Sequence, residues 1–121
     1  MLPYGETIQE HSRHPRNYGS LESPDIRHED VNPFCGDRVR IEVQMAADDT
    51  VREARFQGDL CVIAKAASSL LTVMITGGRV DAVNEEALLR ALNAEIQPAR
   101  RKCALLPLMV LQSGVAEWRK S

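Results

Sequence analysis

The sequence lacks a strong excess of charge of either sign. Fifteen Lys and Arg side chains stand against 17 Asp and Glu side chains, which gives a formal net charge of −2. The basic residues also do not gather in one long tract. A nearly neutral chain of this kind gives no electrostatic reason to expect binding to nucleic acid or to an anionic membrane.

A long uninterrupted apolar run is also missing. The longest apolar span, residues 60–75, contains Lys65 and three hydroxyl side chains, and it falls short of the roughly 20 apolar residues that cross a bilayer. The opening residues, MLPYGETIQEH, do not show the basic-then-apolar pattern of a secretory signal peptide. We therefore expect a cytoplasmic protein with no membrane partner.

Cysteine is scarce, and the number of cysteines is odd. Three cysteines in a protein expected to be cytoplasmic do not suggest a disulfide framework. The 121 residues, 44% of them apolar, suffice to bury a core without disulfides or a metal. We predict one domain, residues 1–121, whose cysteines are either buried small side chains or reactive thiols.

Alternating apolar and polar residues predict the strands. The segment DRVRIEVQMA, residues 37–46, alternates in the period of a half-buried strand, with Arg38, Arg40, Glu42 and Gln44 on its polar face. A short turn, ADD, leads to a partner strand in TVREARFQG, residues 50–58, so we predict a hairpin. The segment DIRHEDVN, residues 25–32, is a further strand candidate.

Helices are predicted before and after these strands along the chain. A first helix within residues 3–14 ends before Pro15, and a mostly apolar helix over 62–75, which should be central, ends at Gly77 and Gly78. Asn84 suits the N-cap of a helix over 85–92. The basic stretch ARRK, residues 99–102, is predicted as a loop. The last helix, within 105–118, should begin just before Pro107, because proline is tolerated in a first turn.

All three cysteines fall at the ends of predicted elements. Cys35 lies on the turn NPFCGD, Cys61 lies where strand gives way to central helix, and Cys103 lies at the start of the last helix. Helix N-termini favour the thiolate form, which binds metals. Together with Asp37 the thiols could supply the four ligands of a tetrahedral Zn2+ or of an iron in a cluster. The alternative is that each cysteine fills the core, since spacings of 26 and 42 residues form no local metal motif.

Three cysteine-containing segments, NPFCGD, GDLCVIAKAASSLLT and RRKCALLPLMVL, resemble the IscU/SufU/NifU N-terminal domain family of iron–sulfur cluster assembly scaffolds. The opening EHSRHPRNYG is also similar to this family, so the resemblance covers nearly the whole chain. It implies an α+β fold in which a three-stranded antiparallel sheet packs against four to five helices. It also implies a surface site at which Cys35, Asp37, Cys61 and Cys103 bind an iron–sulfur cluster, expected to be [2Fe–2S], or zinc.

The resemblance further implies a function. Family members receive sulfur from a cysteine desulfurase and either build a cluster for apo iron–sulfur acceptor proteins or, in the SufU branch, bind zinc and relay persulfide. We interpret the chain as a scaffold rather than an enzyme, with Cys103 as the sulfur acceptor. The alternative is a zinc-dependent sulfur-transfer protein of the SufU type. A purely structural zinc domain is disfavoured, because the apolar content already supplies a core.

The sequence departs from the family pattern at the residues just before the third and the second cysteine. The IscU branch carries a histidine before its third cysteine, inside an LPPVKxHC segment that a dedicated chaperone reads. Here the stretch is IQPARRKC, with Lys102 in place of the histidine, which counts against chaperone recruitment. Lys102 resembles the SufU branch, yet the insertion typical of that branch is missing. The Lys102 ammonium could hold Cys103 as thiolate, or it could be a solvated loop residue. Leu60 stands before Cys61 where the family has glycine.

Other candidates for chemistry are weaker. His11, His14 and His28 have no ligand spacing, and we interpret them as solvated side chains. Trp118 in the last helix is expected to pack on the core.

Overall fold

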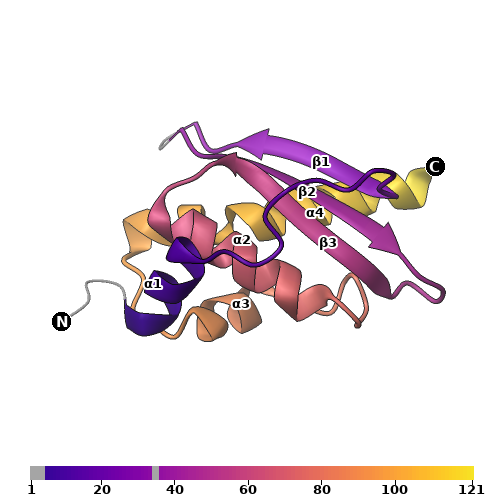
Figure 1. Cartoon of the computed structure of the whole chain (residues 1–121). Coiled ribbons are helices and arrows are strands. Elements are labelled where there is room, and N and C mark those ends of the chain that lie inside the picture. Colours follow the sequence, from indigo (N-terminus) through magenta and orange to yellow (C-terminus); the bar gives the residue numbers. More distant parts are fainter. Residues whose placement is uncertain (1–4, 34–35) are drawn as a thin grey trace.

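A computed structural model describes residues 5–33 and 36–121 of the chain (Figure 1). Along these ranges the elements are, in order, α1 (Gly5–Arg13), β1 (Ile26–Val31), β2 (Arg38–Met45), β3 (Val51–Asp59), α2 (Val62–Ile75), α3 (Glu85–Leu92), a short 3-10 helix η1 (Pro98–Arg100) and α4 (Arg101–Lys120). The predicted α+β fold is confirmed, and so is the position of every predicted strand.

The strands form one antiparallel sheet in the order β1-β2-β3. The predicted hairpin is the β2–β3 pair, in which Ile41 lies opposite Phe56. Helices α2 and α4 lie against one face of the sheet (Figure 1). The inward side chains Val39, Ile41 and Val43 are fully buried on that face, because every second residue of a strand points the same way. The core therefore lies between the sheet and these two helices.

Helix α2 is the central helix that the sequence predicts. Nine of its 14 residues are buried, among them Ile63, Leu71 and Ile75. Helix α3 begins after Asn84, whose Oδ1 accepts a hydrogen bond of 2.8 Å from the Ala87 N–H, as expected of an N-cap. Both helices have the predicted bounds, residues 62–75 for α2 and 85–92 for α3.

Glu42 lies on the polar face of β2, where the alternating sequence pattern predicts an exposed side chain, but it is buried. Glu42 is only 4% exposed, because the loop after α1 crosses the sheet on the side opposite the helices (Figure 1). The Leu21 N–H donates a hydrogen bond of 2.6 Å to Glu42 Oε1, and the Nε atoms of Arg27 and Arg40 lie 3.7 and 3.6 Å from Oε2. A long loop, rather than solvent, thus covers part of the outer face.

The start of α4 corrects two predictions. The stretch 99–102 is not a loop, since it forms the end of η1 and the first residues of α4. Pro107 is not in a first turn either, because it is the seventh residue of a helix that begins at Arg101. Pro107 has no N–H to donate to the Cys103 carbonyl, four residues earlier. The helix nevertheless continues, because its buried side chains Leu106, Leu108 and Leu111 pack on the core.

Core packing of Trp118 and ion pairs of Arg119 hold the C-terminal end of α4 in place. Trp118 is partly buried against the core, as predicted. Arg119 lies 3.0 Å from Asp81 and 3.3 Å from Asp49, and Arg79 contacts the same two carboxylates. Hydrogen bonds from Arg79 and then Arg119 lower the pKa of Asp81 to about 2. In the described ranges, neither α4 nor another helix is both long and apolar enough to cross a membrane.

At one end of the β2–β3 pair, the neighbouring strand leaves no room for a side chain at Gly58. Gly58 lies opposite Val39 and has a φ of 153°, a value that residues other than glycine rarely adopt. A Cβ atom at Gly58 would clash with the Arg38 carbonyl oxygen. Because Asp37 precedes β2 and Cys61 follows β3, the pairing of Arg38 with Asp59 at this end brings Asp37 and Cys61 close to each other.

Gly58→Ala is expected to destabilise the protein by roughly 2–4 kcal/mol, since it adds both backbone strain and a clash with a neighbouring strand. The matched control is Gly19→Ala, because Gly19 has a similar φ of 141° but nothing within 4 Å of its added Cβ. The control should lose only the strain, roughly 1–2 kcal/mol. Urea unfolding measures both, and equal losses would contradict a role for the close strand contact.

Candidate metal-binding site

The predicted turn before β2 is closed by backbone hydrogen bonds at Asn32. The Asn32 N–H donates a bond of 2.7 Å to the Asp37 carbonyl, and the Gly36 N–H donates one of 2.8 Å to the Asn32 carbonyl. Gly36 has a φ of 75°, which suits glycine in a tight turn. The turn leaves Asp37 5% exposed at the start of β2.

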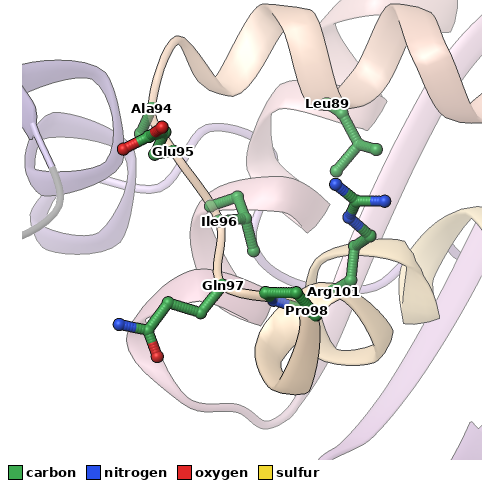
Figure 2. Close-up of a pocket in the computed structure, with 7 residues that line it drawn as sticks. All are labelled: Leu89, Ala94, Glu95, Ile96, Gln97, Pro98 and Arg101. Atoms are coloured by element: carbon green, nitrogen blue, oxygen red, sulfur yellow. The ribbon is translucent and has the colours of Figure 1, made fainter.

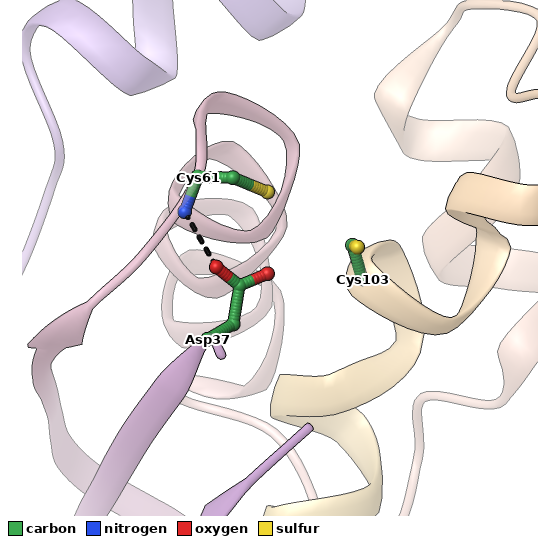
Figure 3. A group of neighbouring side chains, drawn as sticks. All are labelled: Asp37, Cys61 and Cys103. Atoms are coloured by element: carbon green, nitrogen blue, oxygen red, sulfur yellow. Dashed lines mark hydrogen bonds between the residues drawn. The ribbon is translucent and has the colours of Figure 1, made fainter. Parts of the chain in front are cut away.

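Cys61 is the N-cap of α2, at the junction of strand and helix that the sequence predicts. Its Sγ accepts a hydrogen bond of 3.4 Å from the Ala64 N–H, so the thiol caps the helix as a serine would. The Cys61 N–H in turn donates a bond of 2.9 Å to Asp37 Oδ1 (Figure 3). The positive end of the helix dipole therefore faces the sulfur, and the carboxylate fixes the backbone beneath it.

Cys103 is the third residue of α4 and is 2% exposed. Its predicted place at a helix start is confirmed, although α4 begins four residues before Leu105, where the sequence pattern places its first residue. The side chain belongs to the hydrophobic core cluster.

Asp37, Cys61 and Cys103 come together from three separate elements. One donor atom of each lies within 4.8 Å of the donor atoms of the other two, as the facing side chains in Figure 3 illustrate. Two sulfurs and a carboxylate oxygen are ligands that both Zn2+ and iron accept. Ligand atoms around one tetrahedral zinc lie about 3.8 Å apart, which this spacing allows. Cys35, the fourth predicted ligand, lies outside the described residues.

A cavity of about 480 Å³ opens beside the two thiols. Both Cys61 and Cys103 line it, together with the buried Asn32 and the cationic side chains of Arg100 and Lys102. Sequence reasoning did not assign Asn32 or Arg100 to the site. The turn motif NPFCGD was a signal for Asn32, whereas Arg100 is the last residue of η1, an element that the sequence pattern did not predict.

The basic residues 100–102 line two neighbouring cavities. Arg101 points into a second cavity, of about 460 Å³, which Leu89, Ile96 and Pro98 also line (Figure 2). Arg100 and Lys102 therefore belong to the thiol cavity, while Arg101 between them belongs to its neighbour.

The histidines do not join the cluster, since Asp37, Cys61 and Cys103 form the only such group found among residues 5–33 and 36–121. His14 is exposed, as predicted, whereas His11 and His28 are partly buried and each has a side-chain partner. His11 Nδ1 lies 2.7 Å from Ser69 Oγ, and burial followed by the charge of Arg16 lowers the pKa of His11. His28 Nδ1 lies 2.9 Å from Glu117 Oε1.

A three-stranded sheet covered by helices, with two thiols and a carboxylate gathered at its end, defines an α+β protein of the IscU-like fold with a candidate metal site. The chain belongs to the family described as "NifU-like N terminal domain", which matches residues 3–121. This is the iron–sulfur scaffold family that the sequence motifs resemble.

Named relatives come from both branches of the family. The chain is 30% identical to the zinc-dependent sulfurtransferase SufU of Bacillus subtilis, covering 94% of this chain and 90% of SufU. It is 27% identical to the iron–sulfur cluster assembly scaffold protein IscU of Escherichia coli, covering 98% and 95%. The family thus indicates a role as a scaffold or in sulfur transfer.

The alignment with SufU is longer than the alignment with IscU. The SufU alignment spans 134 positions, 13 more than this chain has residues, so at least 13 positions face a gap here. The IscU alignment spans 127 positions, which exceeds the chain by only six. This difference agrees with the expectation that the chain lacks an insertion found in SufU.

Solved structures support the fold alone. A protein from Fervidobacterium islandicum, described as a putative scaffold for the SUF system, superposes with a TM-score of 0.79 at 22% identity, covering 93% of this chain and 96% of that one. A NifU-like protein from Brucella abortus gives 0.81 at 17% identity, covering 98% and 95%.

Asp37 is expected to have two separable effects, which Asp37→Asn and Asp37→Ala distinguish. The asparagine keeps an oxygen for the Cys61 N–H but removes the charge, whereas alanine removes both. In metal-free protein, Asp37→Ala should cost about 1–3 kcal/mol of stability for the unsatisfied N–H, and Asp37→Asn less. Zinc affinity should fall about tenfold or more in both, as competition with a chelating dye would report. Parental zinc affinity in Asp37→Asn would show that the carboxylate is not a ligand.

Proposed function

We propose that this chain is an iron–sulfur cluster assembly scaffold, which accepts sulfur from a cysteine desulfurase and builds a [2Fe–2S] cluster for apo acceptor proteins. The proposed ligands are Cys35, Asp37, Cys61 and Cys103. The observation that carries the proposal is the gathering of two thiols and a carboxylate within 4.8 Å in a member of this family. The ligand role of Cys35 rests on the NPFCGD motif.

Cys103 is the proposed final sulfur acceptor. Its thiolate attacks the outer sulfur of a persulfide, a new S–S bond forms on Cys103, and the cysteine that carried the transferred sulfur leaves as a thiolate. One S–S bond replaces another, so the step needs no oxidant or reductant. Lys102 precedes Cys103 and lines the same cavity, which supports a role for its ammonium in favouring the Cys103 thiolate.

Asp37 suits a scaffold because the cluster is cargo that must be released. A carboxylate is a hard ligand and holds the iron of a sulfide cluster less firmly than a thiolate does. Its Oδ1 already accepts the Cys61 N–H, so Oδ2 is the atom that we assign to the iron. One weak ligand beside three strong ones would allow the cluster to be held and then transferred.

The second candidate is a zinc-dependent sulfur-transfer protein, which would make the chain a sulfurtransferase rather than a scaffold. Two observations favour it: the 30% identity with SufU and the lysine before Cys103. A bound Zn2+ would keep the thiols deprotonated. We place this function second because the chain lacks the extra length of SufU.

Metal and sulfide measurements on protein purified without air test the proposal. A scaffold should contain iron and acid-labile sulfide in equal amounts and absorb visible light. One zinc per chain without visible absorbance would overturn the scaffold function in favour of sulfur transfer.

Substitution of the thiols is the control for the metal measurements. Cys61→Ser and Cys103→Ser should each lose the bound metal while far-UV circular dichroism stays parental, because the core does not depend on a metal. Unfolding of both variants would mean that the cysteines are structural.

Lys102→Ala is expected to slow sulfur uptake by Cys103 from a persulfide-loaded desulfurase two- to fivefold, which corresponds to roughly 0.5–1 kcal/mol for partly exposed charges. Lys102→Arg should retain the parental rate because it keeps the positive charge. The matched control is Arg101→Ala, which removes the adjacent charge from the neighbouring cavity. Equal rates in the parent and Lys102→Ala would identify Lys102 as a solvated side chain.

A further inference from the structure

The two described thiols of the site differ in their access to solvent. Cys103 is 2% exposed and belongs to the core cluster, whereas Cys61 is partly exposed at the end of α2. Both line the same cavity. A sulfur donor that approaches from solvent therefore meets Cys61 more readily than Cys103.

We propose that sulfur enters this chain on Cys61 and then passes within the chain to Cys103. The inference rests on the proposed function, in which Cys103 finally holds the sulfur. It adds the path by which sulfur reaches Cys103, because it makes Cys61 the thiol that first receives the sulfur as well as a ligand.

The spacing of the two sulfurs fits such a transfer. The Sγ atoms of Cys61 and Cys103 lie within 4.8 Å of each other. Two S–S bonds of about 2.05 Å placed end to end span about 4.1 Å, so one sulfur atom fits between the two thiols. The transferred atom can thus contact Cys103 while it is still bonded to Cys61.

The surroundings of Cys61 hold it in place for both steps. Asp37 Oδ1 accepts the Cys61 N–H at 2.9 Å, which fixes the backbone. The Ala64 N–H points at the Cys61 sulfur, and the N-terminus of the 14-residue helix α2 stabilises negative charge there. When the sulfur departs, the thiolate left on Cys61 is therefore stabilised.

The chemistry of the internal step balances without another reactant. The Cys103 thiolate attacks the outer sulfur of the Cys61 persulfide, the S–S bond to Cys61 breaks, and its electron pair stays on Cys61 as a thiolate. The product is a Cys103 persulfide, and the number of S–S bonds is unchanged.

Tryptic mass spectrometry can follow this route directly, because cleavage after Lys and Arg places the three cysteines in different peptides: 28–38, 56–65 and 103–119. Metal-free protein is mixed with one equivalent of cysteine hydropersulfide, and samples are trapped with an alkylating agent over time. In the parent, the extra sulfur should appear first on peptide 56–65 and then move to 103–119, at a rate independent of protein concentration.

Variants report each step. Cys103→Ser should retain the sulfur on peptide 56–65, and Cys61→Ser should load Cys103 at least about tenfold more slowly. Arg101→Ala, which alters only the neighbouring cavity, is the matched control and should leave the order and rate unchanged. The order of labelling in the parent needs no substitution, so the test holds even where a variant folds poorly.

Three results would overturn the route: labelling of 103–119 before 56–65, parental loading of Cys103 in Cys61→Ser, or transfer that accelerates with protein concentration. These outcomes concern only the order of the thiols. Failure of the proposed function would appear separately, as an absence of sulfur uptake from a loaded desulfurase on any cysteine.

Discussion

The hydrogen bond from the Cys61 N–H to Asp37 Oδ1 is the contact on which the site depends. It joins the start of β2 to the start of α2, two points 24 residues apart in the chain. Arg38 pairs with Asp59 at the ends of β2 and β3, and Gly58 beside them has no side chain to clash with the Arg38 carbonyl. The register of the sheet therefore brings Asp37 and Cys61 close together, and α4 brings the third residue, Cys103, to the same place.

The core allows this polar group to exist without a metal. Buried side chains from the sheet, α2 and α4 form one cluster, and Cys103 is part of it. Asp37 is nearly buried, yet one of its oxygens accepts a backbone N–H, which offsets part of the cost of removing a carboxylate from water. A site fixed by protein contacts can lose and regain its metal or cluster without refolding, which a scaffold or carrier requires.

Much of this arrangement was predictable from the sequence, and the exceptions have physical causes. Alternation in β2 and the capping residue Asn84 act locally, so they located their elements correctly. The errors at Glu42 and Pro107 arose because distant segments decide those positions: a loop covers Glu42, and core packing carries α4 through Pro107. Cys61 and Cys103 could be placed at element ends, but the motif resemblance was needed to predict that they share a site, since their spacing forms no local metal motif and a single cysteine is more often a core residue.

The unequal exposure of the two thiols follows from where each lies on its helix. An N-cap residue stands outside the first turn, so Cys61 can cap α2 with its sulfur and still reach solvent. Cys103 lies inside the first turn of α4, on the side that packs against the core, and its neighbour Ala104 is fully buried. Lys102, one residue earlier, is rotated toward the cavity and solvent, because consecutive helical residues point in different directions. A helix cap and a helix turn thus give two chemically identical side chains on one cavity different exposure to solvent, and this difference is the basis of the proposed direction of sulfur transfer.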